Sequence, residues 1–296
     1  MTAARDIPDP DAMTIALLPG WVTSVRAETL EDVAFLSGVA LATLHLALRQ
    51  PGLPHALLRQ RLALEAAEAC VALSGRRETA ADLRDAVHLL RAGDHPGPAG
   101  AVYLAWQRSV ARPISLRALQ QALPAQGADQ IAVWLDAGQG APIDQAARVL
   151  EAVLSDLPRG EDVALILADA ALARALGWDH ILPLLAGGLK SRDLRMSGED
   201  LRAAVHGAVL SGCRTAVHRG ADLSRRVARL ESVAPKLRAK GAHEAVGLFL
   251  TRDVLAPAAL TSLMSDRAAR RFCDRLVDLG VVREMTGRDS FRLYGV

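Results

Sequence analysis

The sequence predicts a mostly α-helical protein, organised as an irregular helical bundle followed by a smaller C-terminal domain. Apolar residues recur at spacings of three and four along most of the chain, and no period-two pattern typical of strands appears before about residue 250. Apolar residues make up 51% of the chain but aromatic residues only 3%, so Ala, Leu and Val must build the core. Such side chains suit closely packed helices.

Prolines or glycines between the helix-period stretches predict short connections from one helix to the next. Residues 1–20 are expected to be flexible, and Thr29, with Asp32 three residues later, is expected to cap the first helix. The predicted helices of the bundle span residues 30–48, 54–73, 78–91, 99–110, 115–123, 128–135, 143–157, 161–176, 181–189 and 199–219. The stretches show no repeat of the length used by helical solenoids, which favours an irregular bundle.

The longest uncharged run, residues 33–48, is 16 residues long. A membrane-spanning helix needs about 20 mostly apolar residues, so this run is predicted to be a buried helix, and no membrane partner is expected. Residues 1–13 contain several acidic residues and two prolines, which a signal peptide lacks. The three cysteines, Cys70, Cys213 and Cys273, are too far apart for a CxxC site. They indicate reduced, buried thiols in a cytoplasmic protein.

Charge is unevenly distributed along the chain. Residues 1–210 contain 19 basic and 24 acidic side chains, whereas residues 211–296 contain 16 basic and 9 acidic ones. A basic tail domain on an acidic body is expected if the tail binds a polyanion, although the two halves could also neutralise each other. The basic residues are 32 Arg and 3 Lys, a bias that genome composition alone can produce.

A break in the helical pattern near residues 231–241 indicates a domain boundary. The expected domains are residues 1–232, which form the helical body, and residues 233–296. Within the second domain, residues 241–252 and 257–263 predict two short helices, with Pro257 at a first helical position.

A third helix is expected to begin at its cap, Ser265, and to stop at Gly280 in a left-handed conformation. Two short strands around a turn at residues 286–289 follow it. This order is typical of a winged helix-turn-helix with a small β-hairpin, a module that most often binds nucleic acid.

The third helix separates an apolar face from a basic one. Arg267, Arg270 and Arg271 lie on the exposed face in its N-terminal half, where recognition helices contact base edges. The hairpin adds Arg283, Arg288 and Arg292, which could contact phosphates of double-stranded DNA. Acidic residues on the same face oppose this interpretation: Asp274 and Asp278 follow the arginines. A surface ion pair between Arg270 and Asp274 would account for these two side chains without any contact to DNA.

Residues 274–294 resemble the winged-helix tail behind the catalytic domain of many Fic-type AMP-transferases, through Asp274-Arg275-Leu276-Val277-Asp278-Leu279-Gly280-Val281-Val282-Arg283 and Phe291-Arg292-Leu293-Tyr294. The resemblance does not extend to catalysis. Fic enzymes need a His-Pro-Phe … Gly-Asn-Gly-Arg loop, and the nearest segment, Asp94-His95-Pro96-Gly97-Pro98, lacks the glycine-asparagine cradle and its arginine. AMP transfer is therefore not expected.

The whole chain also resembles a bacterial domain-of-unknown-function family, number 1403. The stretches that carry this resemblance are Arg84-Asp85-Ala86-Val87-His88-Leu89, Gly93-Asp94-His95-Pro96-Gly97-Pro98-Ala99-Gly100, Leu167-Ala168-Asp169-Ala170, Leu176-Gly177-Trp178, Ala234-Pro235-Lys236-Leu237-Arg238-Ala239-Lys240-Gly241-Ala242 and the C-terminal tail. This family implies no activity.

One cluster could carry chemistry. Asp85 and His88 share a helix face, and Asp94 and His95 follow the end of that helix, so the four could bind a divalent metal or share a proton. The simpler interpretation is that His88 interacts with the helix dipole and Asp94 caps a turn. No phosphate-binding loop, nucleophile elbow or HExxH motif is present, so no cofactor is expected and an enzyme is the weaker hypothesis.

Three functions therefore stand in order of preference. The first is a cytoplasmic DNA-binding or regulatory protein acting through the C-terminal domain. The second is a scaffold for a protein partner or for homo-oligomers through the helical domain, and the third is an enzyme or metal-binding protein that uses the Asp85, His88, Asp94 and His95 cluster.

Overall fold

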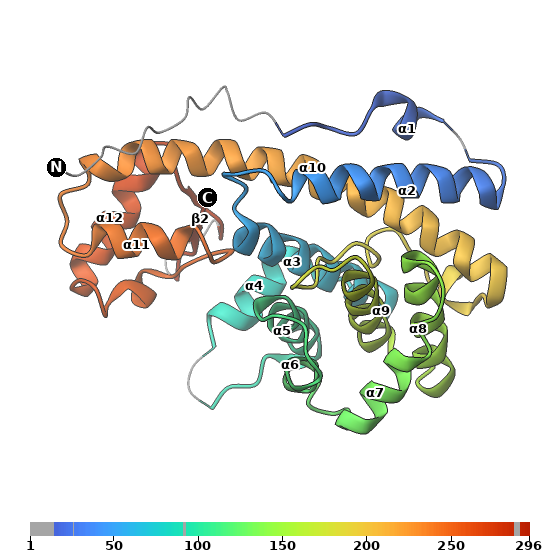
Figure 1. The fold of residues 1–296 in the computed structure, drawn as a ribbon. Helices are drawn as coiled ribbons and strands as arrows, with labels where there is room; N and C mark the ends of the chain where they lie inside the picture. The colour runs from blue at the N-terminus through green and yellow to red at the C-terminus, as the bar shows by residue number, and fades with distance from the viewer. Residues whose placement is uncertain (1–14, 26, 91–92, 287–290) are drawn as a thin grey trace. The chain divides into compact units, whose positions relative to one another are not determined.

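A computed structural model describes residues 15–25, 27–90, 93–286 and 291–296 of the chain (Figure 1). The described residues are mostly helical, as predicted, with a small two-stranded sheet near the C-terminus. The helices are α1 (Gly20–Ser24), α2 (Leu30–Ala47), α3 (His55–Leu73), α4 (Ala80–His88), α5 (Gly97–Ala111), α6 (Leu116–Ala122), α7 (Ala128–Asp136), α8 (Pro142–Asp156), α9 (Glu161–Ala175), α10 (Gly198–Val233), α11 (Ala242–Phe249) and α12 (Asp266–Asp278). Short 3-10 helices are η1 (Asp193–Arg195), η2 (Ala234–Lys236) and η3 (Pro257–Leu260), and the strands are β1 (Arg283–Glu284) and β2 (Tyr294–Gly295).

The chain folds into two compact units. The larger unit contains residues 17–45 and 59–216, and the smaller unit contains residues 1–16, 46–58 and 217–296. Helices α2, α3 and α10 each contribute to both units. The smaller unit therefore contains the C-terminal segment from residue 233 onward together with the end of α10 and two segments from early in the chain. Most of the predicted flexible stretch, residues 1–14, lies outside the described residues.

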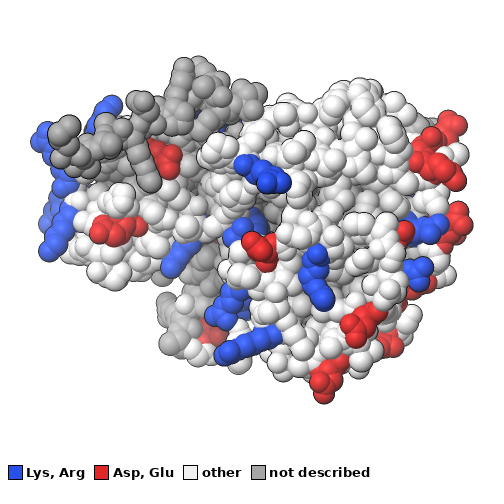
Figure 2. All heavy atoms as spheres, in the orientation of Figure 1, with Lys and Arg blue, Asp and Glu red and all other residues white. Residues whose placement is uncertain are grey.

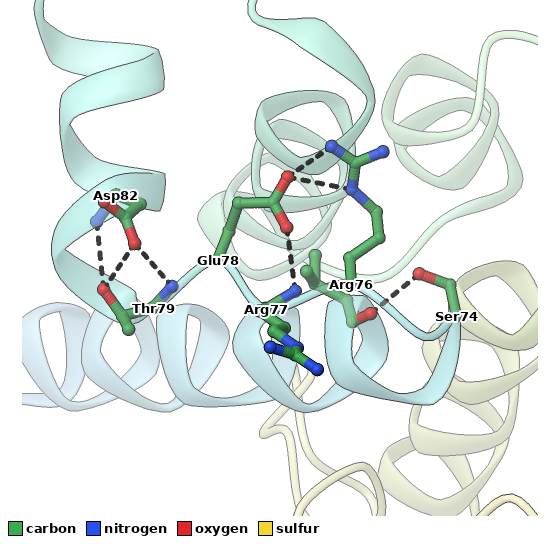
Figure 3. A network of polar contacts seen from close by, with 7 residues as sticks. Ser74, Arg76, Arg77, Glu78, Thr79 and Asp82 are labelled. Carbon is green, nitrogen blue, oxygen red and sulfur yellow. Dashed lines mark hydrogen bonds and ion pairs between the residues drawn. The ribbon is translucent and has the colours of Figure 1, made fainter.

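Threonine caps begin two of the early helices, at Thr29 as predicted and at Thr79, which was not predicted. Thr29 caps α2: its backbone N–H donates to the Asp32 carboxylate (3.1 Å), and its hydroxyl accepts from the Asp32 N–H (3.1 Å). Thr79 and Asp82 form the same reciprocal arrangement at α4 (Figure 3). Just before it, the Arg76 guanidinium binds Glu78 and lowers the pKa of that carboxyl. Helix α4 ends at His88, so the predicted helix over residues 78–91 is shorter at both ends.

Helix α9 forms the centre of the larger unit. Every residue from Val163 to Ala173 is buried, so this helix is enclosed on all sides. Helix α8 packs along it (Figure 1), and α5 and α7 also contact it. A helix enclosed in this way has no solvent-facing stripe, and Ala, Leu and Ile accordingly fill its circumference.

One charged side chain, Asp169, lies inside this core with only 1% of its surface exposed. Both of its carboxylate oxygens accept from the Leu184 N–H at 3.2 Å, and the Leu185 N–H also donates to it. Burial raises the pKa of Asp169 well above its ordinary value, while the two backbone bonds act in the opposite direction. The carboxylate thus holds the segment that follows α9.

That segment corrects one prediction. Residues 181–189 were expected to form a helix, but they form an irregular buried stretch with bends and turns. Pro183 has no N–H, and the next two N–H groups donate to Asp169 instead of to helix carbonyls. The apolar residues of this stretch, Ile181, Leu182 and Leu185 among them, are apolar because they are buried. The helix prediction was wrong because periodicity alone does not distinguish a helix from a buried irregular segment.

Glycines let this segment approach α10 closely. A Cβ added to Gly212 would lie 2.8 Å from the Leu184 Cα, and one added to Gly188 would lie 2.9 Å from the Ala208 Cβ. Real Cβ atoms essentially never approach other atoms so closely, so the contact requires glycine at both positions. Backbone packs against backbone here, which a sequence pattern does not reveal.

Helix α10 is longer than predicted. The expected helix ended at Arg219, before Gly220, but the observed helix continues to Val233. A Cβ on Gly220 would lie 3.0 Å from the Leu53 side chain, so this glycine makes room for a neighbour and does not end the helix. The helix ends where a break was expected, at the 3-10 helix η2.

Helix α2 contains the uncharged run that was predicted to be a buried helix. Its length and mean hydropathy of 1.4 over 18 residues would allow it to cross a membrane, but core helices and N-terminal signal sequences share these properties. Only 33% of the window is buried. The prediction of a helix is confirmed, but that of burial holds for one face alone: Leu36, Ala40 and Leu44 are buried, whereas Phe35 and Leu46 are exposed.

Replacing Asp169 by Ala should lower the free energy of unfolding by about 2–4 kcal/mol, because two buried N–H groups lose their acceptor. Urea unfolding followed by circular dichroism measures the change. Asp129→Asn, at an exposed carboxylate in the first turn of α7, is the control and should change little. An Asp169→Ala protein as stable as the wild type would contradict the role assigned to this carboxylate.

The Asp169→Asn variant keeps an acceptor oxygen and removes the titration. Because burial raises the pKa of Asp169 in the folded protein, its contribution to stability is fully present below the unfolded value of 3.8. This contribution is lost as the pH rises through the folded value. The stability of the wild type relative to Asp169→Asn should therefore fall as the pH rises from acid toward neutral, and parallel curves would refute this.

Gly212→Ala should destabilise the protein by about 1–3 kcal/mol, because the new methyl group overlaps the Leu184 backbone. Gly207 provides a matched control in the same helix, since no atom lies within 4 Å of a Cβ placed there. Gly207→Ala should be neutral or stabilising by up to about 1 kcal/mol, through helix propensity. Equal midpoints of urea unfolding for the two variants would show that the close approach is not required.

Candidate nucleic-acid interface

Helix α12 is built as the sequence predicted. The Ser265 hydroxyl accepts from the Ala268 N–H (3.4 Å) at its start, and Gly280 adopts a left-handed φ of 69° after its end. One face of the helix is buried through Ala269, Phe272, Cys273 and Leu276. Burial raises the pKa of the Cys273 thiol to about 12, so this cysteine stays protonated and packs as an apolar residue.

Two short strands follow α12. Strands β1 and β2 are antiparallel, with Arg283 opposite Gly295 and Glu284 opposite Tyr294. On its other side Tyr294 pairs with Leu255, and the two exchange backbone hydrogen bonds of 2.8 and 2.9 Å. Leu255 precedes η3, so the pairing joins the segment before α12 to the strand after it. The predicted turn at residues 286–289 falls mostly outside the described residues.

The three arginines predicted for a recognition helix are exposed on α12. Arg270 pairs with Asp266 one turn earlier, at 3.0 Å from Nε to the carboxylate. The expected partner was Asp274, and the structure corrects this assignment. Within the described part of the chain, Arg267 and Arg271 form no ion pair. The N-terminal half of α12 therefore presents two positive charges that form no ion pair with a described carboxylate.

Asp274 has a different role. Its carboxylate accepts from the Tyr294 hydroxyl (3.2 Å), which ties α12 to strand β2. The Tyr294 hydroxyl also interacts with the Arg292 guanidinium, and this hydrogen bond raises the pKa of Arg292, assisted by the charges of Asp274 and Glu284. Burial raises the pKa of Tyr294 in turn. The sequence offered no signal for this link, because 20 residues separate its two ends.

The hairpin arginines therefore differ from one another. Arg283 is exposed on β1. Arg292 is exposed as well, but it faces two carboxylates and a hydroxyl. Glu284 also accepts from the Thr286 N–H (2.7 Å), at the start of the loop. Arg288 lies outside the described residues, so its predicted contact is not described.

Further basic residues belong to the same unit but were interpreted from sequence only as a domain boundary. Lys236, Arg238 and Lys240 are all exposed in the segment between α10 and α11. Figure 2 shows basic side chains gathered along the edge of the molecule where α10 ends in Figure 1. Charge counting along the chain could have added them to the candidate residues.

The other candidate cluster does not assemble into a metal site. Among the described residues, which include Asp85, His88, Asp94 and His95, no three His, Cys, Asp or Glu side chains are placed to hold a metal ion. His88 is half-buried and contacts the Tyr103 ring edge-on at 6.4 Å between centroids. Asp94 and His95 are exposed before α5, whose N-cap position is occupied by Pro96. His88, which the metal hypothesis required as a ligand, thus packs against the Tyr103 ring instead.

A family model described as "Protein of unknown function (DUF1403)" matches residues 8–296. The chain belongs to this family. The match covers both units of the fold, and the resemblance noted from the sequence is thereby confirmed. No curated protein matches the chain. The DUF1403 family therefore identifies what kind of chain this is, and its function has to be argued from the structure.

Tyr294→Phe should destabilise the protein by about 0.5–1.5 kcal/mol, because it removes the hydroxyl that bonds to Asp274 and interacts with Arg292. Urea unfolding measures the change. Phe291→Leu, at an exposed position in the same segment, provides a control that should have little effect. Unchanged stability of Tyr294→Phe would mean that the hydroxyl does not hold β2 to α12.

Proposed function

We propose that residues 233–296 form a winged helix-turn-helix domain that binds double-stranded DNA, and that this DUF1403 protein is a cytoplasmic DNA-binding or regulatory protein. The order α11, η3, α12, β1 and β2 supports the fold assignment. The bridge from Leu255 to Tyr294 supports it further, since it pairs one residue of the segment before η3 with the two-stranded sheet.

The observation that carries the proposal is the charge on the N-terminal half of α12. Arg267 and Arg271 are exposed one helical turn apart, and no described carboxylate pairs with them. Recognition helices present their N-terminal residues to base edges in the major groove. Arginine is well suited to that position because its guanidinium donates two parallel hydrogen bonds to guanine.

Arg270 can join these two residues at little cost. Its pair with Asp266 is exposed on both sides, with 69% and 57% of the side-chain surfaces accessible. Exposed pairs of this kind contribute about 0–1 kcal/mol, so a phosphate can replace the carboxylate. Arg283 and Arg288 would contact phosphates from the hairpin, whereas Arg292 already interacts with acidic neighbours and would contribute less.

The acidic residues of α12 constrain how it would approach DNA. Asp274 and Asp278 lie in its C-terminal half and would repel phosphates. The helix would therefore enter the groove with its N-terminal end, leaving the C-terminal half outside. Lys236, Arg238 and Lys240 would add phosphate contacts at the edge of the interface.

The second candidate function is a scaffold that binds a protein through the helical domain. The exposed apolar residues of α2 favour it. This function is compatible with DNA binding, because α2 and the basic residues belong to different elements.

Full-length protein should bind a mixed-sequence duplex with a strong dependence on salt. If about five phosphates are neutralised, the plot of log K against log salt concentration should have a slope of roughly −4 to −5. Fluorescence anisotropy of a labelled duplex measures it. Absence of binding at low salt would overturn the proposal.

Arg267→Ala with Arg271→Ala should weaken binding by at least tenfold and make the salt slope shallower by about 2, with unchanged circular dichroism. Arg270→Ala with Arg271→Ala should have a similar but smaller effect, because Arg270 must first leave Asp266. Arg108→Ala, at an exposed arginine in α5, is the control and should bind as the wild type does. Unaltered affinity of both double variants would remove α12 from the interface.

A further inference from the structure

Helix α2 exposes a row of apolar residues along one face. Phe35 and Leu46 are 62% and 65% exposed, and Gly38 and Ala42 are exposed between them. These four residues lie on one face, since their spacings are three, four and four. Trp21 extends the row, because its ring stacks on Phe35 at 6.0 Å between centroids and is itself 49% exposed. Exposed apolar side chains gathered on one face commonly mark an interface.

Gly38 is unexplained by contacts inside the chain. It lies in the middle of α2, where glycine is unfavourable compared with alanine. No atom lies within 4 Å of a Cβ placed on it, so no neighbour among the described residues requires its small size. Gly38 and Ala42, four residues apart, form a small-residue pair that allows a second helix backbone to approach closely.

Charges on the same face indicate which helix would approach. Glu31 lies one turn before Phe35, and Arg49 lies in the turn that closes α2, held by its N–H bond to the Leu46 carbonyl (3.1 Å). Both side chains are exposed, and both fall on the apolar face by helical spacing. The face is therefore acidic at one end, apolar in the middle and basic at the other end.

Such a face is complementary to itself when two copies run antiparallel. A two-fold axis at the level of residue 40 places each Gly38 opposite Ala42 of the other copy. The same register places each Glu31 opposite Arg49 of the other copy. One register thus satisfies the small-residue contact and both charge pairs at once, as expected of an isologous interface.

Other side chains of α2 hold the helix within the larger unit. The Ser37 hydroxyl and His206 Nδ1 lie 2.7 Å apart, and the Trp178 Nε1–H donates to His45 Nδ1 at 2.9 Å. These polar contacts, with the buried residues Leu36, Ala40 and Leu44, favour a helix that stays packed over one that leaves to cross a bilayer. A partner at its outer face is favoured instead.

We propose that this chain forms a two-fold homodimer in which the α2 helices pack antiparallel across Gly38 and Ala42, with Glu31 of each copy bound to Arg49 of the other. This proposal does not depend on DNA binding, and it names the second copy of the chain as the partner of the exposed α2 face.

Sedimentation equilibrium of the full-length protein tests it, at concentrations up to about 100 µM. The wild type should dimerise. Glu31→Arg and Arg49→Glu should each weaken the dimer by about tenfold or more, because two attractions become two repulsions. The double variant Glu31→Arg with Arg49→Glu should restore the wild-type affinity. Arg108→Glu, at an exposed residue of α5, is the charge control and should leave dimerisation unchanged.

Gly38→Leu tests the close approach. The space above Gly38 accommodates the new side chain in the monomer, but the side chain would separate the two helices, so dimerisation should be lost with unchanged circular dichroism. Gly247→Leu is the matched control, since Gly247 is also exposed within a helix and has no atom within 4 Å of an added Cβ.

The possible results show whether a second copy of the chain or a membrane covers the exposed face of α2. A wild-type monomer at every concentration overturns the proposal, and so does a dimer that Gly38→Leu leaves intact. Loss of the dimer in Gly38→Leu without any effect of charge reversal overturns the antiparallel register. A monomer that sediments with vesicles of mixed zwitterionic and anionic lipid, and loses this binding in Phe35→Ser with Leu46→Ser, assigns the face to a membrane instead.

Discussion

The carboxylate of Asp169 is the interaction on which the arrangement of the larger unit depends. Helix α9 is enclosed by its neighbours, so a charge in its middle requires hydrogen-bond partners. It finds them in the Leu184 and Leu185 N–H groups, and it thereby fixes the course of the chain between α9 and α10. Asp169 also lies near the thiols of Cys70 and Cys213, whose pKa values are raised first by burial and further by this carboxylate. Helices α3 and α10 are thus close to the same buried charge.

The close contacts around this charge explain the placement of glycine in the larger unit. Because the 181–189 segment is pulled toward α9, its backbone packs against α10, and only glycine at positions 188 and 212 leaves room for the approach. A buried irregular segment needs its polar groups satisfied, and the Asp169 carboxylate does so for two of them. The glycines and the aspartate are therefore parts of one arrangement, although they lie far apart in the chain.

In the smaller unit, the charges of α12 are divided by role. The N-terminal half presents arginines to solvent, whereas Asp274 in the C-terminal half bonds to Tyr294 and helps to hold strand β2. The residue that seemed to oppose nucleic-acid binding thus has a structural task of its own. Arg292 was expected to contact a phosphate, but it interacts with Tyr294 and lies near two carboxylates, so it too has a structural role. Counting charges does not separate these roles, because they depend on which side chains meet between α12 and strand β2.

The sequence by itself determined the helical class, the start of most helices and the face of α12 that is buried. These features are local: the caps Thr29 and Ser265, the stop at Gly280 and the apolar spacing act within a few residues. Only the tertiary structure decided that residues 181–189 are not helical, that α10 runs through Gly220 and that α2 is covered on one face. It also decided that Asp85, His88, Asp94 and His95, all described, are not placed to hold a metal ion. Each of these depends on atoms contributed by distant segments, and a local pattern carries no information about which distant segment will be the neighbour.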